Sequence, residues 1–167
     1  MNFKVINPRE LQGNVFKLIG DKWMLITAAK ENGEVNTMTA SWGGMGIMWG
    51  KPVASCVVRP VRYTYEFMEA ADYFTLTFFP EEYRKALNLL GTKSGRDGDK
   101  IAESGLNPVK IQDVFSFEEA EITLICKKIY YQDIDPANFT DKDLDRNYPN
   151  KDYHRMYFGE IVEAFIK

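Results

Sequence analysis

The stretch Val53-Ala-Ser-Cys-Val-Val58, continued by Arg59-Pro-Val-Arg-Tyr-Thr64, has the pattern of a buried strand that turns into a helix. Its first half is uncharged and rich in β-branched residues, as is typical of a buried strand. Thr64 is a suitable N-cap for the helix, with Glu66 in the first turn and Phe67 on the inner face. The sequence therefore predicts a strand, a turn that carries two arginines, and a helix, in that order.

Five more strands are predicted around this unit, each an apolar or alternating run bounded by turn residues. One helix is predicted over Glu81–Leu90, because Pro80 suits its first position and Gly91 suits its stop. Trp42–Gly50 holds four glycines, which argues against a regular element there. Strands without regular helical alternation favour a mainly antiparallel barrel or sandwich over a doubly wound sheet. The five strands are Met24–Ala29, Val35–Ser41, Tyr73–Phe79, Glu121–Gln132 and Tyr157–Ile166.

The composition is that of one globular domain, which we expect to span residues 1–167. Of the 167 residues, 45% are hydrophobic and 27% are charged, which is enough to bury a core. A net charge of −3 argues against a nucleic-acid partner, since such a partner requires a clustered basic face. No apolar run is long enough to span a membrane, and Met1–Arg9 carries charge and proline where a secretory leader needs an apolar segment. We expect no membrane contact and a cytoplasmic location.

The two cysteines, Cys56 and Cys126, each lie in an apolar, strand-like run. Two lone cysteines do not make a disulfide scaffold, and the sequence holds no CxxC pair. We therefore predict that both are reduced residues of the core. A zinc site is not expected, because only one histidine accompanies them.

A calcium loop is the one metal-binding alternative. Asp141, Asp143 and Asp145 fall at positions 1, 3 and 5 of such a loop, and Asp152 falls at position 12. Position 6 is Arg146 where the loop requires glycine, and no flanking pair of helices is evident. These departures favour a solvated acidic loop, and we expect no metal site.

The segment Asn36–Trp42 places small hydroxylated residues at alternating positions of a strand that ends at glycines. Hydroxyls and free backbone N–H groups at a strand end suit the edge of a ring or a phosphate. The alternative is an ordinary half-exposed strand, in which threonine and serine are common. A P-loop, a GxGxxG dinucleotide motif and a GxSxG nucleophile elbow are all missing from the sequence.

The turn Arg59–Thr64 has the parts of an anion site, because two guanidinium groups meet the positive end of a helix. The alternative is a loop with two surface arginines. The segment Lys93-Ser94-Gly95-Arg96-Asp97 offers a way to close such a site, although by itself it is a flexible loop.

Taken in order and spacing, these motifs resemble the flavin reductase-like family of FMN-binding split barrels, and most closely its flavoredoxin-type branch. The resemblance is carried by Asn36-x-Met-Thr-x-Ser-Trp42, by Arg59-Pro-x-Arg-Tyr-Thr64 and by Lys93-Ser-Gly95. Trp49-Gly-Lys-Pro52 and His154-x-x-x-x-Gly-Glu-Ile161 fit the same pattern. The likeness runs from about residue 14 to residue 165.

The resemblance implies a mainly β fold, a six-stranded antiparallel split β-barrel with a few short helices, closed by formation of a homodimer. FMN would lie near the dimer interface. The flavin ring would be lined by Met38, Thr39, Ala40, Ser41 and Trp42. The ribityl and phosphate end would be held by Arg59, Pro60, Arg62, Tyr63 and Thr64, with help from Lys93, Ser94 and Gly95.

The implied function is that of an FMN flavoprotein oxidoreductase in which NADH or NADPH reduces the flavin. Free flavin or a redox protein would then accept the electrons. His154 is the candidate catalytic residue, at the nicotinamide side, although a lone histidine at a strand start is also a common structural residue. The sequence departs from the family pattern in the long, charged segment Asp135–Asp152 and at Tyr153, where many members carry an aspartate.

Three other functions stay open at this point. One is a flavoredoxin-type electron carrier that holds FMN but does not oxidise NAD(P)H. A second is an enzyme similar to pyridoxamine-phosphate oxidases, although its phosphorylated substrate would need a second basic cluster that the sequence does not offer. The third is a binding module without a cofactor, in which the arginines are surface charges.

Overall fold

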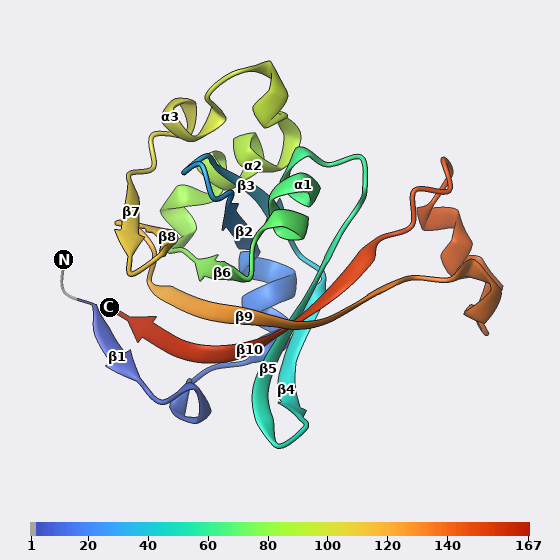
Figure 1. The fold of residues 1–167 in the computed structure, drawn as a ribbon, viewed down its shortest axis with the longest axis horizontal. Helices are drawn as coiled ribbons and strands as arrows, with labels where there is room; N and C mark the ends of the chain where they lie inside the picture. The colour runs from blue at the N-terminus through green and yellow to red at the C-terminus, as the bar shows by residue number, and fades with distance from the viewer. Residues whose placement is uncertain (1–2) are drawn as a thin grey trace.

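A large antiparallel sheet organises the computed structural model, which describes residues 3–167 (Figure 1). Its strands follow the order β3-β2-β6-β9-β10-β5-β4, with β1 paired to the far end of β10. The path leaves β3 and β4 as edges, so the barrel stays open. The strands of this sheet are β1 (Lys4–Ile6), β2 (Met24–Ala29), β3 (Val35–Ala40), β4 (Gly43–Met48), β5 (Lys51–Val58), β6 (Tyr73–Phe78), β9 (Ile122–Asp133) and β10 (Arg155–Ile166).

The predicted fold class, a mainly β antiparallel split barrel with few short helices, is confirmed. All six predicted strands form, with ends within two residues of the prediction. Strands β1 and β4 extend the sheet to eight. A separate hairpin of β7 (Pro108–Ile111) and β8 (Val114–Phe117) was not predicted.

The glycine-rich stretch was wrongly predicted to be irregular, because it forms β4 as the edge partner of β5. Glycine is what allows this pairing: Gly43 has a φ of +155°, and a Cβ at that position would collide with the carbonyl oxygen of Ser55. The glycines therefore bring two backbones together, and they do not interrupt the strand.

Three short helices gather on one side of the sheet (Figure 1), and they are α1 (Tyr63–Ala70), α2 (Arg84–Thr92) and α3 (Lys100–Ser104). The second predicted helix starts later than expected, because a 3-10 turn over Glu81–Tyr83 precedes it, and it continues through Gly91. The N-cap assigned to Thr64 is also wrong, since Arg62 occupies that position. The Thr64 hydroxyl instead accepts a hydrogen bond from the buried amide of Asn36.

Two more short helical segments lie near the N-terminus, a 3-10 turn over Pro8–Glu10 and a π-helical turn over Lys17–Lys22. The core lies between the sheet and the helices and includes Met24, Ile26, Phe67, Phe74 and Tyr157, all at most 2% exposed. Both cysteines are free and buried in it, which confirms the prediction of reduced core residues.

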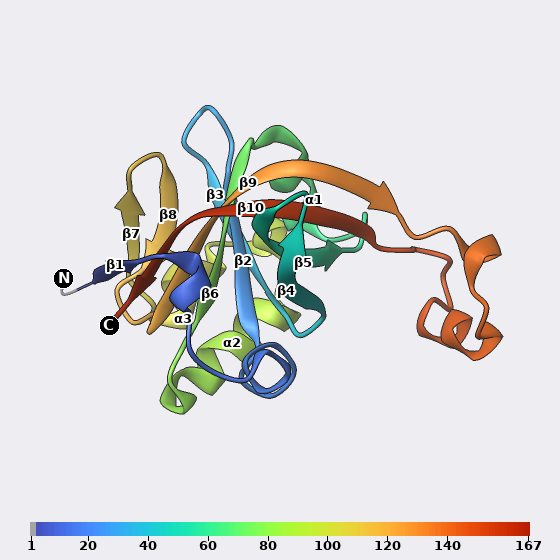
Figure 2. The ribbon, with the colours of Figure 1, turned by 90° about the horizontal axis from the view of Figure 1, so that it is seen from below.

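Strands β9 and β10 are each twelve residues long and project beyond the body as a two-stranded arm (Figure 2). The arm carries the segment 134–154, which holds 3-10 turns at Pro136–Asn138 and Lys142–Asn147. Arg155 fixes the arm, because its guanidinium contacts Asp133 on β9 at 2.6 Å and Glu69 on α1 at 2.9 Å. The arm therefore leaves the body at a defined angle beside β5 and α1.

We expect Gly159→Ala to destabilise the fold. Gly159 lies at a register shift between β9 and β10, and an added Cβ would come within 2.7 Å of Cys126 Cβ and Phe74 Cζ. Overpacking of this kind costs about 1–3 kcal/mol, which urea unfolding would measure. Gly46→Ala is the control, because nothing lies within 4 Å of its added Cβ. Equal stability of the two variants would contradict the packing argument.

Candidate functional site

The first of two pockets, here called the strand-end pocket, forms where β3 ends. It has a volume of about 210 Å³ and brings the predicted ring-facing residues together with His154, which lies more than a hundred residues further along the chain. The pairing of β10 with β5 sets this proximity, because Arg155 is opposite Val58 and the residues next to them therefore meet. The pocket is lined by Met38, Thr39, Ala40, Ser41, Trp42, Val57, Arg59 and His154.

The second pocket, here called the basic pocket, lies at the start of α1 and has a volume of about 80 Å³. It is lined by residues of the predicted turn Arg59–Thr64 and of the predicted loop Lys93–Asp97, which the family resemblance also placed together. Two predicted residues lie elsewhere: Arg59 lines the strand-end pocket, and Pro60 is exposed and lines neither pocket. The basic pocket is lined by Asn36, Val61, Arg62, Tyr63, Thr64, Thr92, Lys93, Ser94, Gly95 and Lys100.

Lys100 is a member of the basic pocket that the sequence did not reveal. Its side chain is buried, and its Nζ donates to the carbonyl oxygens of Leu90 at 2.9 Å and Lys93 at 3.0 Å. Arg62 donates to the neighbouring Gly91 carbonyl oxygen at 2.8 Å. Both cations therefore lie at the negative, C-terminal end of α2. In the sequence, only the position of Lys100 seven residues after Lys93, where α3 begins, links it to the motif.

These two cations have no carboxylate partner among residues 3–167, which is unusual for a buried charge such as that of Lys100. Burial, with a contribution from Arg62, lowers the pKa of Lys100 to about 8. Burial and the nearby Arg59 also lower the pKa of Arg62. Lysine has three donor hydrogens and only two acceptors are filled here, so Lys100 keeps a donor for a ligand. A phosphate group fits this set of donors by both charge and size.

The loop of the basic pocket packs directly on β3. Gly95 lies against Asn36, and an added Cβ would be only 2.5 Å from Asn36 Oδ1 and 2.9 Å from the Tyr63 ring. Ser94 accepts a hydrogen bond from the Arg96 backbone at 3.2 Å. The ammonium group of Lys93 contacts Glu103 on α3 at 2.6 Å, so its charge is already paired.

Arg59 holds the arm segment against the strand-end pocket. It pairs with Asp152 at 2.9 Å, donates to the Asn147 carbonyl oxygen at 2.9 Å, and lies 4.8 Å from the ring centroid of Tyr148. His154 lies beside it, with its ring centroid 5.2 Å from that of Trp42. Burial, together with the positive charge of Arg59, lowers the pKa of His154 to about 4. The imidazole is therefore neutral at pH 7.

The aspartates that match the spacing of a calcium loop do not point toward a common site. Asp145 bonds to Lys151 and Tyr153, and Asp152 pairs with Arg59. Within residues 3–167, no group of three or more histidine, cysteine, aspartate or glutamate side chains is placed to hold a metal ion. In the same part of the chain, no helix has the length and apolar character needed to cross a membrane.

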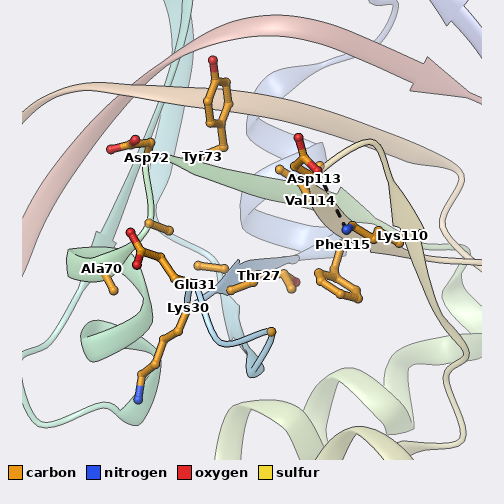
Figure 3. A pocket seen from close by; sticks show the side chains of 14 residues that line it. Thr27, Lys30, Glu31, Ala70, Asp72, Tyr73, Lys110, Asp113, Val114 and Phe115 are labelled. Atoms are coloured by element: carbon orange, nitrogen blue, oxygen red, sulfur yellow. Dashed lines mark ion pairs between the residues drawn. The ribbon is translucent and has the colours of Figure 1, made fainter.

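A third cavity of about 340 Å³ lies between the β2–β3 turn, the end of α1 and the β7–β8 hairpin (Figure 3). Its two lysines pair with carboxylates: Lys110 with Asp113 at 3.8 Å, and Lys30 with Glu34 at 3.5 Å. Figure 3 shows Lys30 extending away from Lys110. We therefore assign no chemistry to this cavity.

The model of the family described as "Flavin reductase like domain" matches residues 17–167. The chain therefore belongs to the flavin reductase-like family. A comparison with curated protein sequences gives no match.

Solved structures share the fold at low sequence identity. An FMN-binding domain of a flavin reductases-like enzyme from Shewanella baltica OS155 is 18% identical, with a TM-score of 0.71 over 99% of this chain and 77% of that one. A flavin reductase with a split barrel domain from Shewanella frigidimarina NCIMB 400 is 15% identical, with a TM-score of 0.70 over 96% and 77%. Flavoredoxin of Desulfovibrio vulgaris (Miyazaki F) is 22% identical, with a TM-score of 0.68 over 87% and 69%.

We expect Lys100 to make the free energy of unfolding depend on pH in the alkaline range. Its pKa is about 8 in the folded chain and 10.5 when unperturbed, so the unfolded chain binds more protons between these values. Stability should therefore rise across this window by an amount on the order of 3 kcal/mol. Urea unfolding of the native chain and of Lys100→Met at pH 7.5 and at pH 10 measures the difference. Lys85→Met, at an exposed position on α2, should show the native pH dependence. The same dependence in Lys100→Met would contradict the assignment.

Proposed function

We propose that this chain is an FMN-binding oxidoreductase. The phosphate of FMN would occupy the basic pocket, and the flavin ring would lie in the strand-end pocket. The observation that carries the proposal is the pair of cations, the half-buried Arg62 and the buried Lys100, which line the basic pocket without a carboxylate partner. The family membership and the FMN-binding solved structures support the same cofactor.

The residues of the chain would bind and orient the cofactor. Arg62 and Lys100 would offer charged donors to the phosphate, and the N-terminus of α1 would add its positive end. Met38 and Trp42 would border the ring, and the hydroxyls of Thr39 and Ser41 lie in the same pocket. Bound FMN would supply the redox chemistry, which is the transfer of a hydride and a proton, or of single electrons, between two substrates.

NADH or NADPH is the reductant that this proposal assigns to the protein. The strand-end pocket is open to one side, and Trp42 is 46% exposed, which leaves a flat aromatic surface for a nicotinamide ring. The neutral His154 would act there as a hydrogen-bonding group, because its pKa of about 4 leaves it without charge. Free flavin or a redox protein would accept the electrons. The second candidate is a flavoredoxin-type electron carrier, favoured by the structural likeness to flavoredoxin.

We further propose that the chain forms a homodimer. Strand β4 is an open edge, and the hairpin tip beside it exposes Ile47 and Trp49 by 57% and 60%. A groove of about 680 Å³, with Met48, Trp49, Tyr130 and Phe158 among its lining, continues from this tip to the arm. An apolar surface of this kind typically marks a contact with another protein.

We also propose that the protein works in the cytoplasm, because its two cysteines are free and buried, as is typical of a reducing compartment.

Sedimentation equilibrium tests the dimer, with twice the chain mass as the expected result. Trp49→Glu should give a monomer, because it places a charge in the apolar surface. Val5→Glu is the matched control, at an exposed position on β1. A native chain that sediments as a monomer at every concentration would refute the dimer.

Lys100→Met should weaken FMN binding at least about tenfold, since a charged hydrogen bond contributes roughly 1.5–3 kcal/mol. Quenching of FMN fluorescence measures the dissociation constant. Lys85→Met makes the same charge change on an exposed surface and should keep native affinity. Absence of quenching by the native chain would reject the cofactor and favour a binding module without one, and tight binding of pyridoxal phosphate would favour the pyridoxamine-phosphate-oxidase-like alternative.

Anaerobic stopped-flow mixing separates the two oxidoreductase candidates. A reductase should lose the visible absorbance of its oxidised flavin when NADH or NADPH is added. An electron carrier should keep that absorbance with both nucleotides and lose it only with a chemical reductant. Reduction by neither nucleotide would contradict the reductase.

A further inference from the structure

The arm segment brings a tyrosine onto the single histidine of the chain. Tyr148 lies within the segment 134–154, and its hydroxyl oxygen is 2.8 Å from Nδ1 of His154. Both side chains are buried, with exposures of 3% and 9%. His154 at the same time lines the strand-end pocket and contacts Trp42. The segment is therefore connected to the pocket through one hydrogen bond.

Tyr148 is held firmly in this position. Its ring is stacked with Phe139, at 6.2 Å between centroids, and lies 4.8 Å from the Tyr153 ring. Arg59 covers it at 4.8 Å and is itself fixed by Asp152. These contacts come from both ends of the segment and from the turn that follows β5, so the hydroxyl has a defined direction toward His154.

The direction of the hydrogen bond follows from the chemistry of the two groups. A neutral imidazole carries one hydrogen, on either Nδ1 or Nε2. Burial raises the pKa of Tyr148, so the phenol keeps its proton. A phenol is a stronger hydrogen-bond donor than a neutral imidazole, because its proton is the more acidic. Tyr148 therefore donates and Nδ1 accepts, which leaves the ring hydrogen on Nε2.

We propose that Tyr148 is a positioning residue, which holds His154 in the tautomer with hydrogen on Nε2 and so gives the strand-end pocket a neutral donor. The ligand class that such a donor selects is a planar ring bearing a carbonyl or carboxamide oxygen. Only this choice of ligand rests on the proposed function, since the tautomer is a property of the chain alone. The inference also assigns a role to the long segment, which the family resemblance left unexplained.

The test is nitrogen NMR of protein labelled with ¹⁵N-histidine, without FMN. The chain has one histidine, so only two ring nitrogens contribute. The native protein at pH 7 should show one protonated and one unprotonated nitrogen, with the protonated one identified as Nε2 by its couplings to both ring carbon-bound hydrogens. We expect this tautomer to exceed the other by about fivefold or more, the ratio that one net hydrogen bond supplies. A protonated Nδ1 in the native protein would overturn the proposal without any variant.

Tyr148→Phe should reduce this preference toward that of a free imidazole, so that the two nitrogen shifts move toward each other. Tyr153→Phe is the control, because that hydroxyl bonds to Asp145 and belongs to the same aromatic group. It should keep the native shifts. Unchanged shifts in a folded Tyr148→Phe protein would also overturn the inference. The NMR result does not depend on FMN binding. If the chain failed to bind FMN, the proposed function would be wrong, but the tautomer of His154 would still be measured and the inference would be tested separately.

A second readout concerns ligand selection in the FMN-loaded protein. Tyr148→Phe should raise the KM for NAD(P)H about threefold or more and should change the FMN dissociation constant much less, since the basic pocket proposed for the phosphate is untouched. An equal effect on both quantities would indicate a general structural role and would overturn the positioning role.

Discussion

The antiparallel pairing of β5 with β10 is the constraint on which the site depends. It aligns Val58 with Arg155, so the turn that follows β5 meets the residues that precede β10. Arg59 and His154 thereby share one pocket although 94 positions separate them in the chain. A shift of the register by one residue would move each of these side chains to the opposite face of the sheet. Gly159 pairs with Ala54 in this ladder, and on its other side β10 has a register shift against β9 at the same residue, so the packing of one glycine supports the strand that carries the pocket.

The second organising feature is the positive charge of the half-buried Arg62 and the buried Lys100 at the C-terminal end of α2. Arg62 and Lys100 donate to the carbonyl oxygens of Leu90, Gly91 and Lys93, which are the groups that the end of a helix leaves without partners. This arrangement orders the loop but places two cations beside each other. Their mutual repulsion and burial favour an anion in the basic pocket, because an anion would stabilise the protonated form of Lys100. The same contacts therefore serve both the fold and a ligand.

Much of this structure was predictable from local patterns, and the exceptions have physical reasons. The six strands follow from runs of apolar and β-branched residues, since that signal is contained within each segment. Strand β4 was missed because its glycines serve a close approach to Ser55, which only the paired structure reveals. Thr64 was wrongly assigned as a cap because its hydroxyl has a distant partner, Asn36. Lys100 was missed for a similar reason: burial of a lysine depends on the fold around it.

The two arginines of the turn show how far a sequence motif reaches. Arg59 and Arg62 have the same side chain and lie three positions apart, so the motif alone treats them alike. Asp152, on the far end of the arm segment, pairs with Arg59 and draws it toward Tyr148, whereas Arg62 has only carbonyl partners. Because Asp152 pairs with Arg59 only, Arg59 holds the arm segment, and Arg62 keeps its positive charge available for an anion. An insertion far along the chain can therefore change which part of a shared motif faces a ligand, even when every motif residue is retained.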